Sequence, residues 1–191
     1  MFVIISDLHF VDGTAGEHNI PMDAFHVFFE NLKSATERLK KKKREVKEIK
    51  IVSLGDIFDL LRTEEWFEHI HEDERPWGIK ETKIKQHAND IFDKIINANE
   101  ATFELLSGSL KRKFGFHIEP ERVYIPGNHD RLCNKYSTLR EKVRKNLGIK
   151  PAKGRFAHYF QDTAYGVFAR HGHEYDIYNY EGAHPINTKI T

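Results

Sequence analysis

Three short apolar runs, each followed at once by a polar cluster, constrain the fold of this 191-residue chain more than any other feature. The runs extend from Phe2 to Ser6, from Ile49 to Leu54 and from Arg122 to Pro126. Their length and their β-branched residues predict buried strands. The polar residues that follow them are therefore expected at strand ends.

An amphipathic helix is expected between the first two strands, over Pro21 to Glu48. Its apolar side chains recur at intervals of three and four residues: Phe25, Phe28, Leu32, Ala35 and Leu39. The order strand, helix, strand predicts a right-handed parallel crossover, so the polar clusters after strands one and two lie at the same edge of the sheet. Ligand sites of α/β proteins form at that edge.

The remainder of the chain predicts a helical layer and a second sheet. Residues 62–121 form a long interval that contains a second helical stretch, about Lys80 to Leu110. The segment Glu64 to Trp77 is interpreted either as core or as a lid over the strand ends. Two more strands, Phe156 to Phe160 and Gly166 to Arg170, are joined by a short loop. The pattern indicates the α/β class.

Composition restricts the size, the partners and the compartment. The length suits a single domain over residues 1–191. The 30 basic and 29 acidic side chains nearly cancel, so net charge does not support a nucleic-acid or membrane partner. The basic run Lys40 to Arg44 is interpreted first as a solvated helix end, with a nucleic-acid role as the weaker alternative. A single cysteine, Cys133, and the absence of a long apolar segment predict a cytoplasmic chain without a membrane span.

Metal-capable residues follow the predicted strands. They form the groups Asp7-Leu8-His9, Gly55-Asp56-Ile57-Phe58-Asp59, Gly127-Asn128-His129-Asp130 and His171-Gly172-His173. An Asp-x-His sequence directs two side chains to the same side of an extended segment. The glycines before Asp56 and Asn128 allow tight turns and a close approach of the backbone to a ligand. Mixed oxygen and imidazole ligands suit Mn²⁺, Fe or Zn²⁺ better than Ca²⁺.

Each group also has a simpler interpretation on its own. Asp7 and His9 alone fit a strand-end turn with a helix cap, and His129 fits a buried histidine bonded to backbone. Asp59 is interpreted as turn-forming, or as contacting a ligand residue, rather than as a ligand itself. His171 and His173 lie two residues apart, so either can bind while the other faces solvent or substrate, and His171 is the preferred ligand.

Taken in order, the four groups resemble the motifs of the calcineurin-like metallophosphoesterase superfamily. Asp-x-His, Gly-Asp-x-x-Asp, Gly-Asn-His-Asp and a later strand-end histidine run from residue 7 to residue 171. The resemblance implies two mixed β-sheets packed face to face with flanking helices. It makes residues 62–121 a helical insertion or cap. It also implies two divalent metal ions, of which Mn²⁺ is favoured over Fe and Zn²⁺.

The resemblance assigns a ligand set to each metal. Asp7 and His9 are expected to bind the first metal, and Asn128 and His171 the second. The carboxylate of Asp56 is expected to bridge the two.

The resemblance also assigns the proton donor. His129 is expected to face the substrate as a catalytic residue, with Asp130 or Asp7 orienting its ring. Asp59 and His173 are expected to contact ligand residues or to serve as alternative ligands.

Two positions depart from the family pattern. Leu60 stands where the family has arginine, with Arg62 two places on, which leaves a phosphate contact open. The Gly-His-x-His segment that supplies one imidazole to each metal does not follow His171, and the nearest fragment is Gly182-Ala-His184-Pro185. We therefore expect either that the natural chain continues beyond residue 191 to such a segment or that the site is incomplete. In the second case His173 or His184 is the candidate replacement ligand.

The function implied by the resemblance is hydrolysis of a phosphomonoester, phosphodiester or pyrophosphate. A hydroxide activated by two metals would attack phosphorus, and His129 would protonate the leaving oxygen. The competing hypothesis is a non-catalytic scaffold or binding module that retains the fold. The missing Gly-His-x-His favours the scaffold, whereas the presence of His129 favours the enzyme.

Overall fold

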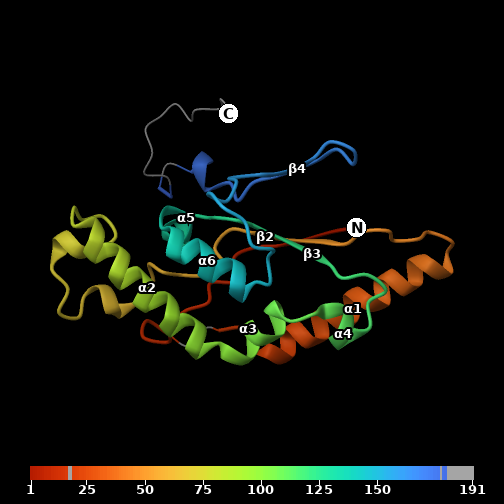
Figure 1. Ribbon diagram of the computed structural model, residues 1–191, viewed down its shortest axis with the longest axis horizontal. Coiled ribbons are helices and arrows are strands. Elements are labelled where there is room, and N and C mark those ends of the chain that lie inside the picture. The colour runs from red at the N-terminus through yellow and green to blue at the C-terminus, as the bar shows by residue number, and fades with distance from the viewer. Residues whose placement is uncertain (17–18, 177, 180–191) are drawn as a thin grey trace.

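The protein is an α/β protein built on a three-stranded parallel sheet (Figure 1). The computed structural model describes residues 1–16, 19–176 and 178–179. The parallel strands lie in the order β1 (Phe2–Ile5), β2 (Lys50–Leu54) and β3 (Glu121–Ile125). A second, antiparallel sheet consists of β4 (Phe160–Asp162) and β5 (Val167–Ala169). The α/β class and the first three strands are confirmed, each strand lying within about a residue of its predicted bounds.

Helices connect the strands and cover one face of the parallel sheet. They are α1 (Met22–Lys41), α2 (Glu81–Ala98), α3 (Glu100–Ser107), α4 (Leu110–Phe114), α5 (Arg131–Lys135) and α6 (Ser137–Asn146), with short 3-10 turns η1 (Glu64–Trp66), η2 (Glu72–Glu74) and η3 (His173–Tyr175). The first crossover contains α1, and the second contains α2, α3 and α4. In the described part of the chain, none of these helices has the length and apolar character that crossing a bilayer requires.

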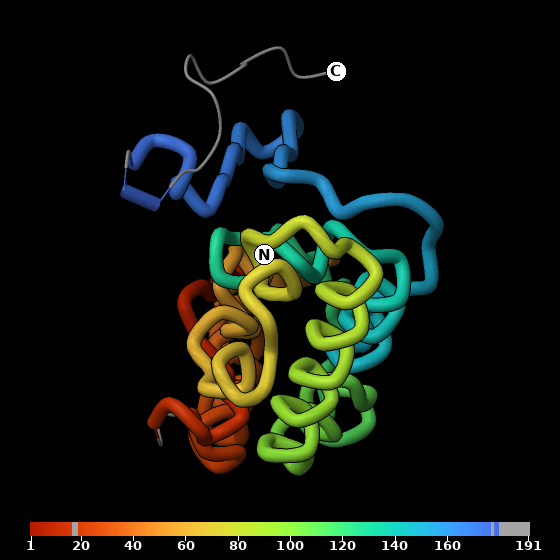
Figure 2. Tube along the Cα trace, turned by 90° about the vertical axis from the view of Figure 1, so that its left-hand side faces the viewer, coloured from red at the N-terminus to blue at the C-terminus, as the bar shows by residue number. Residues whose placement is uncertain are grey.

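The parallel sheet buries both of its faces, but unequally. On β2, Ile51 belongs to the large core that the helices build, whereas Val52 packs with Phe160 in a small cluster beneath the β4–β5 hairpin. Neighbouring residues of a strand point to opposite faces, so helices and hairpin lie on opposite sides of the sheet, as Figures 1 and 2 show. Among the described residues neither sheet mixes strand directions. The predicted face-to-face sandwich of two mixed sheets is thus not confirmed beyond the α/β class.

Helix α1 is shorter than predicted. It ends at Lys41 rather than near Glu48. Lys43 adopts a left-handed backbone (φ 59°), and the N–H of Arg44 turns back to donate to the carbonyl of Leu39 (2.9 Å). Leu39 is the last apolar residue before Val46, so a longer helix would have no further apolar face to bury.

The predicted helix from Lys80 to Leu110 is divided into α2, α3 and α4. The first break lies at Asn99, whose backbone leaves helical geometry (φ −126°, ψ 26°). Its side-chain amide donates to the carbonyls of Ile95 (2.8 Å) and Val11 (3.0 Å). The amide therefore ties the helix end to the segment that follows β1.

The first strand of the hairpin also begins later than predicted. It begins at Phe160 instead of Phe156. The backbone of Phe156 is engaged by the side chain of Asn134, which accepts from its N–H (2.7 Å) and donates to its carbonyl (3.1 Å). The backbone of Phe156 is consequently held by α5 and is not free to pair with β5.

Candidate functional site

The segments that follow β1 and β2 run side by side at the carboxyl edge of the sheet. Their backbones are joined by hydrogen bonds from Asp7 N to Gly55 O (3.1 Å), His9 N to Asp56 O (2.9 Å) and Phe10 N to Ile57 O (2.9 Å). The predicted meeting of these polar clusters at one edge is confirmed.

Three residues of this edge have strained backbone. Asp7 (φ 56°), His9 (φ 47°) and Asp56 (φ 52°) all adopt left-handed conformations. Such conformations cost a non-glycine residue about 1–3 kcal/mol each, and they persist where the surrounding structure enforces them, often at functional sites. All three belong to the predicted ligand set, so the strain is concentrated where the side chains must converge.

Two glycines leave room for the converging side chains. A Cβ atom on Gly127 would lie 2.2 Å from Oδ1 of Asp56, and one on Gly55 would lie 2.3 Å from the ring of His171. Gly55 also has a left-handed backbone (φ 78°). Both glycines therefore allow side chains of the predicted ligand set to approach the backbone closely, while the predicted approach to a ligand stays a prediction.

We predict that Gly127→Ala displaces the Asp56 carboxylate. Overpacking of this kind costs about 1–3 kcal/mol of unfolding free energy, and the shift should also weaken binding of Mn²⁺. Urea unfolding and a Mn²⁺ titration measure the two effects. Gly154→Ala is the control for the Mn²⁺ titration, because a Cβ on Gly154 meets nothing within 4 Å; its left-handed backbone (φ 91°) makes it unsuitable as a control for unfolding. An Mn²⁺ affinity equal to that of the control would show that Gly127 does not shape the site.

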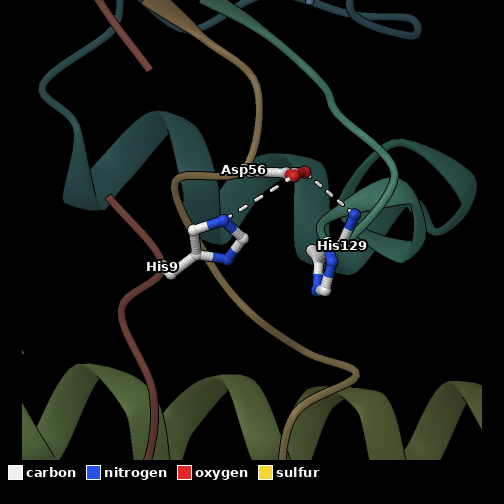
Figure 3. A group of neighbouring side chains, drawn as sticks. All are labelled: His9, Asp56 and His129. Carbon is white, nitrogen blue, oxygen red and sulfur yellow. Dashed lines mark hydrogen bonds and ion pairs between the residues drawn. The ribbon is translucent and has the colours of Figure 1, made fainter. Parts of the chain in front are cut away.

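The carboxylate of Asp56 lies at the centre of the site, and its side chain is only 5% exposed. Its Oδ1 accepts the backbone N–H of His129 (2.9 Å), and Figure 3 shows it between His9 and His129. Its Oδ2 lies 3.4 Å from Nε2 of His171 and 3.9 Å from Nε2 of His9. Asp7 extends this set, since its Oδ1 lies 3.5 Å from Nε2 of His171.

These atoms form two overlapping groups with metal-ligand character. One consists of Asp7, Asp56 and His171, and the other of His9, Asp56 and His129, with ligand atoms within 4.8 Å of one another in each group. Atoms that bind one ion at about 2.0–2.2 Å lie roughly 3–4 Å apart, so the separations fit shared coordination after small shifts. Asp56 is common to both groups. The sets differ from the expected ones, because His171 lies with Asp7 and His129 lies with His9.

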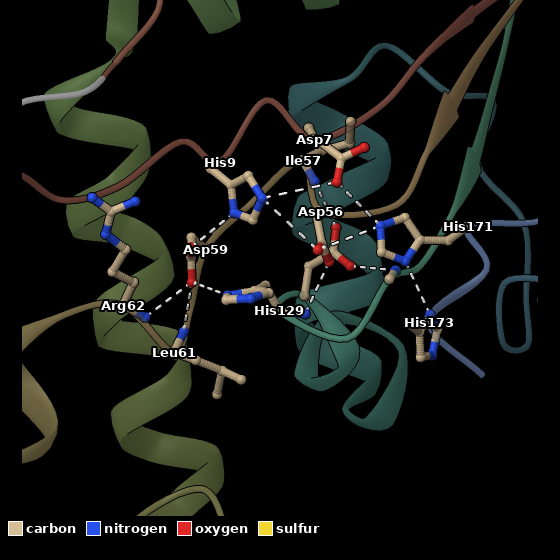
Figure 4. A network of polar contacts seen from close by, with 12 residues as sticks. Asp7, His9, Asp56, Ile57, Asp59, Leu61, Arg62, His129, His171 and His173 are labelled. Carbon is tan, nitrogen blue, oxygen red and sulfur yellow. Dashed lines mark hydrogen bonds and ion pairs between the residues drawn. The ribbon is translucent and has the colours of Figure 1, made fainter. Parts of the chain in front are cut away.

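Asp59 holds two histidine rings at once (Figure 4). Its Oδ2 lies 2.9 Å from Nδ1 of His9, and its Oδ1 lies 2.8 Å from Nδ1 of His129. Oδ1 also accepts the backbone N–H groups of Leu61 (3.3 Å) and Arg62 (2.9 Å). Although burial opposes the charged form, the hydrogen bonds from His129, His9 and the Arg62 N–H lower the pKa of Asp59.

An ionised carboxylate only accepts hydrogen bonds, so Asp59 holds both rings through an N–H at Nδ1. This leaves Nε2 of His9 facing Asp56 and Asp7, whose oxygens lie 3.9 and 4.0 Å away. Either a proton on Nε2 or a metal ion between these atoms compensates the two carboxylates. The donor set therefore fits a metal ion.

Asp130 does not orient the His129 ring. It is completely buried and accepts the backbone N–H groups of Gly127 (2.6 Å) and Ile57 (3.0 Å). Burial raises the pKa of Asp130 to about 6. The orientation expected from Asp130 or Asp7 is supplied by Asp59, and Asp130 instead ties the turn after β3 to the segment after β2.

Asn128 and His173 are the remaining predicted site residues that the structure describes. Asn128 is half-buried between Gly127 and His129, and its side chain makes no hydrogen bond within the described residues. His173 turns its Nδ1 toward Nδ1 of His171 (3.0 Å), so it contacts the preferred ligand rather than solvent. Burial lowers the pKa of His173, which favours a neutral ring. His184, the other candidate replacement ligand, lies outside the described residues.

Sequence reasoning missed an ion pair beside His173. Arg170 and Glu174 form a salt bridge (2.8 Å), and Oε2 of Glu174 lies 3.8 Å from Nδ1 of His173. The signal was the acidic residue directly after His-Gly-His. Of the two interpretations of Glu64 to Trp77, core or lid, the core interpretation fits Trp66, which is fully buried. Trp77 is 60% exposed and does not belong to the core.

Comparison with known proteins yields no matching family model, no matching curated sequence and no matching solved structure, so function is argued from the geometry of the site.

Proposed function

We propose that this protein is a metal-dependent hydrolase of phosphate esters. The observation that carries the proposal is the Asp56 carboxylate, which belongs to two groups of potential ligand atoms at the carboxyl edge of the sheet. Supporting it are the strained backbone at Asp7, His9 and Asp56 and the hydrogen bond to Asp59 that turns Nε2 of His9 toward Asp56 and Asp7.

The two ligand groups would hold two divalent ions. Asp7, Asp56 and His171 would hold one ion, and His9 with Asp56 would hold the second. Asn128, which directly precedes His129, is a further candidate ligand for the second ion. Oxygen and imidazole donors suit Mn²⁺, Fe or Zn²⁺, and we favour Mn²⁺. When bound, the two ions would lower the pKa of an attacking water and neutralise charge on the phosphoryl oxygens.

His129 would protonate the leaving oxygen as the phosphorus–oxygen ester bond breaks. Its Nδ1 is held by Asp59, which leaves Nε2 as the nitrogen that can face a substrate, and the side chain is 33% exposed. The hydrogen bond to Asp59 raises the pKa of His129 above its usual 6.5. A raised pKa keeps the acid protonated near neutral pH, as a general acid requires.

Two further proposals concern the fold around the site and the cellular location of the protein. We infer a two-sheet sandwich from the apolar cluster of Val52, Ile125 and Phe160 that joins the parallel sheet to the hairpin. A cytoplasmic location is proposed from Cys133, a buried free thiol.

A metal titration combined with an activity assay tests the proposal. The full chain is titrated with Mn²⁺ by calorimetry, and hydrolysis of bis(p-nitrophenyl) phosphate is followed over the same range. We expect hydrolysis to rise as the sites fill. Binding without turnover would support the scaffold alternative, and absence of both would refute the metal site.

We predict that Asp59→Asn moves the basic limb of the pH–rate profile to lower pH. Because Asp59 raises the pKa of His129, activity should fall only as pH rises through that raised value. With a neutral partner, the pKa and the fall return toward about 6.5. The measurement is kcat against pH for an alkyl phosphodiester at saturating Mn²⁺, because a p-nitrophenolate leaves without a proton and would hide the role of His129.

The matched control is Asp90→Asn, because Asp90 is an exposed carboxylate on α2. An Asp59→Asn profile with a lower rate but an unchanged basic limb would assign Asp59 a purely structural role.

A further inference from the structure

Two basic segments lie on α1 with its following turn and on α4, two helices that pack against each other. Residues 38–47, at the end of α1 and in the following turn, contain seven lysines or arginines and one acid, Glu45. Residues 111–113 of α4 are Lys111, Arg112 and Lys113. All ten of these cationic side chains belong to exposed residues. We call the two segments together the basic surface.

Helix α4 packs on the first half of α1, and the chain after α4 reaches the turn after α1. Phe114 turns into the core against Phe29 (ring centroids 5.3 Å apart) and His26 (4.9 Å), which leaves the three cations before it on the outside. The ring Nε2 of His117 lies 2.5 Å from the carbonyl of Val46 and so joins the chain after α4 to the turn after α1.

A hollow of about 240 Å³ lies beside the first segment. Its lining includes two lysines, Lys33 and Lys40, and two acids, Glu37 and Glu45. The hollow is therefore not itself basic, and the cations of the basic surface are projecting side chains.

One carboxylate, Glu45, lies within the basic surface among its ten cations, and the other nearby acids have partners of their own. Within the described residues, no salt bridge involves any of its ten cations. The neighbouring acids have other partners: Glu37 pairs with Lys33 (3.6 Å) and Glu48 with Lys50 (3.0 Å). Glu119 accepts from Ser109 (2.7 Å) and from the backbone N–H of Leu110 (3.1 Å). The charge of the surface is thus available to a partner.

The basic surface lies at the opposite end of the sheet from the candidate metal site. Residues 38–47 precede β2, whereas Asp56 follows it, and the five residues of the strand span about 17 Å. Figure 1 shows the turn after α1 and helix α4 at the end of the molecule away from α5. A ligand held here need not touch the metal site.

We propose that the basic surface binds the phosphate backbone of a nucleic acid. Closely spaced phosphates attract a dense group of exposed cations without any requirement for base contacts. A membrane is the poorer fit, because surface helices that bind lipid add an apolar face, and the large exposed apolar side chains lie outside both segments. The proposal goes beyond the hydrolase function and does not depend on it.

Fluorescence anisotropy with a short labelled duplex DNA tests the proposal, in EDTA so that neither metal bridging nor cleavage contributes. Salt is varied between about 50 and 200 mM, and the slope of log K against log[salt] should change by about 0.9 for each phosphate that a variant no longer neutralises. For the triple variant Lys40→Gln, Lys41→Gln, Lys42→Gln, we expect the slope to become less negative by up to about 3. Affinity at low salt should fall at least about tenfold.

A matched control makes the same change of charge elsewhere. Lys145→Gln, Lys150→Gln, Lys153→Gln alters three exposed lysines outside the basic surface and should leave binding within about twofold of the wild type. The double variant Lys111→Gln, Lys113→Gln probes the α4 segment independently, in case the end of α1 loosens. Thermal melts monitored by circular dichroism check folding.

Three results would overturn the proposal. The first is equal loss of affinity in the test and control triples, and the second is wild-type binding that does not respond to salt. The third is tighter binding to phosphatidylserine vesicles than to DNA.

Discussion

Asp56→Asn is expected to abolish metal binding and phosphodiester hydrolysis together. The asparagine keeps an oxygen that can accept the His129 N–H, so the turn can keep its shape. It loses the charge that Asp56 places between the two ligand groups. Loss of residues that only touch a ligand costs about 10–100-fold in metal affinity. Loss of the shared carboxylate should exceed that, so we expect more than about a 100-fold drop.

Elemental analysis and hydrolysis of bis(p-nitrophenyl) phosphate measure the two effects on the same preparation. The control is Asp90→Asn, which removes a carboxylate from an exposed position. We expect its metal content and rate to match those of the unaltered protein. An Asp56→Asn protein that keeps its metal and its activity would contradict the central role of Asp56.

The part of the fold that positions the site was predictable from the sequence. Short β-branched runs have few alternatives when a polar cluster and a glycine follow at once, and the strand–helix–strand order implies parallel pairing. The carboxyl ends of the strands therefore had to meet. The structure brings Asp7, His9 and Asp56 together there, as the order of the elements predicts.

Two of the boundary errors occurred where a side chain from a distant segment bound the backbone, whereas α1 ended early through a local turn. Asn99 ends α2 by donating to Val11, 88 residues away in sequence. Asn134 engages Phe156 and so shifts the start of the hairpin. Local periodicity contains no information about such contacts, because either segment alone fits a regular element.

The same limit applies inside the site. The sequence places Asp130 next to His129, yet the ring is held by Asp59, 70 residues away. Asp130 points into the core toward the N–H groups of Gly127 and Ile57. Adjacency in sequence does not determine side-chain direction, whereas residue types at a sheet edge indicate which groups can converge.

For alkyl esters, His129→Ala is expected to lower kcat by a factor of about 10²–10⁴, the range for loss of one general acid. Metal stoichiometry should stay unchanged, because the His129 ring turns its Nδ1 to Asp59 and because Asp7, His9, Asp56 and His171 remain to bind. Removal of the ring leaves Asp59 with one fewer donor, so His129→Gln serves as a second variant that can still donate a hydrogen bond. Neither variant can protonate a leaving oxygen.

The dependence on the leaving group decides what His129 does. A p-nitrophenolate leaves without a proton, whereas an alkoxide needs one, so the loss in the two variants should be small for p-nitrophenyl esters and large for alkyl esters. The control is His26→Ala, which removes an imidazole from α1 and should lower both rates equally or not at all. Equal losses for both leaving groups in the His129 variants would show that the ring stabilises the phosphoryl charge or serves as a ligand in the group with His9 and Asp56. An accompanying fall in bound metal would identify the ligand role.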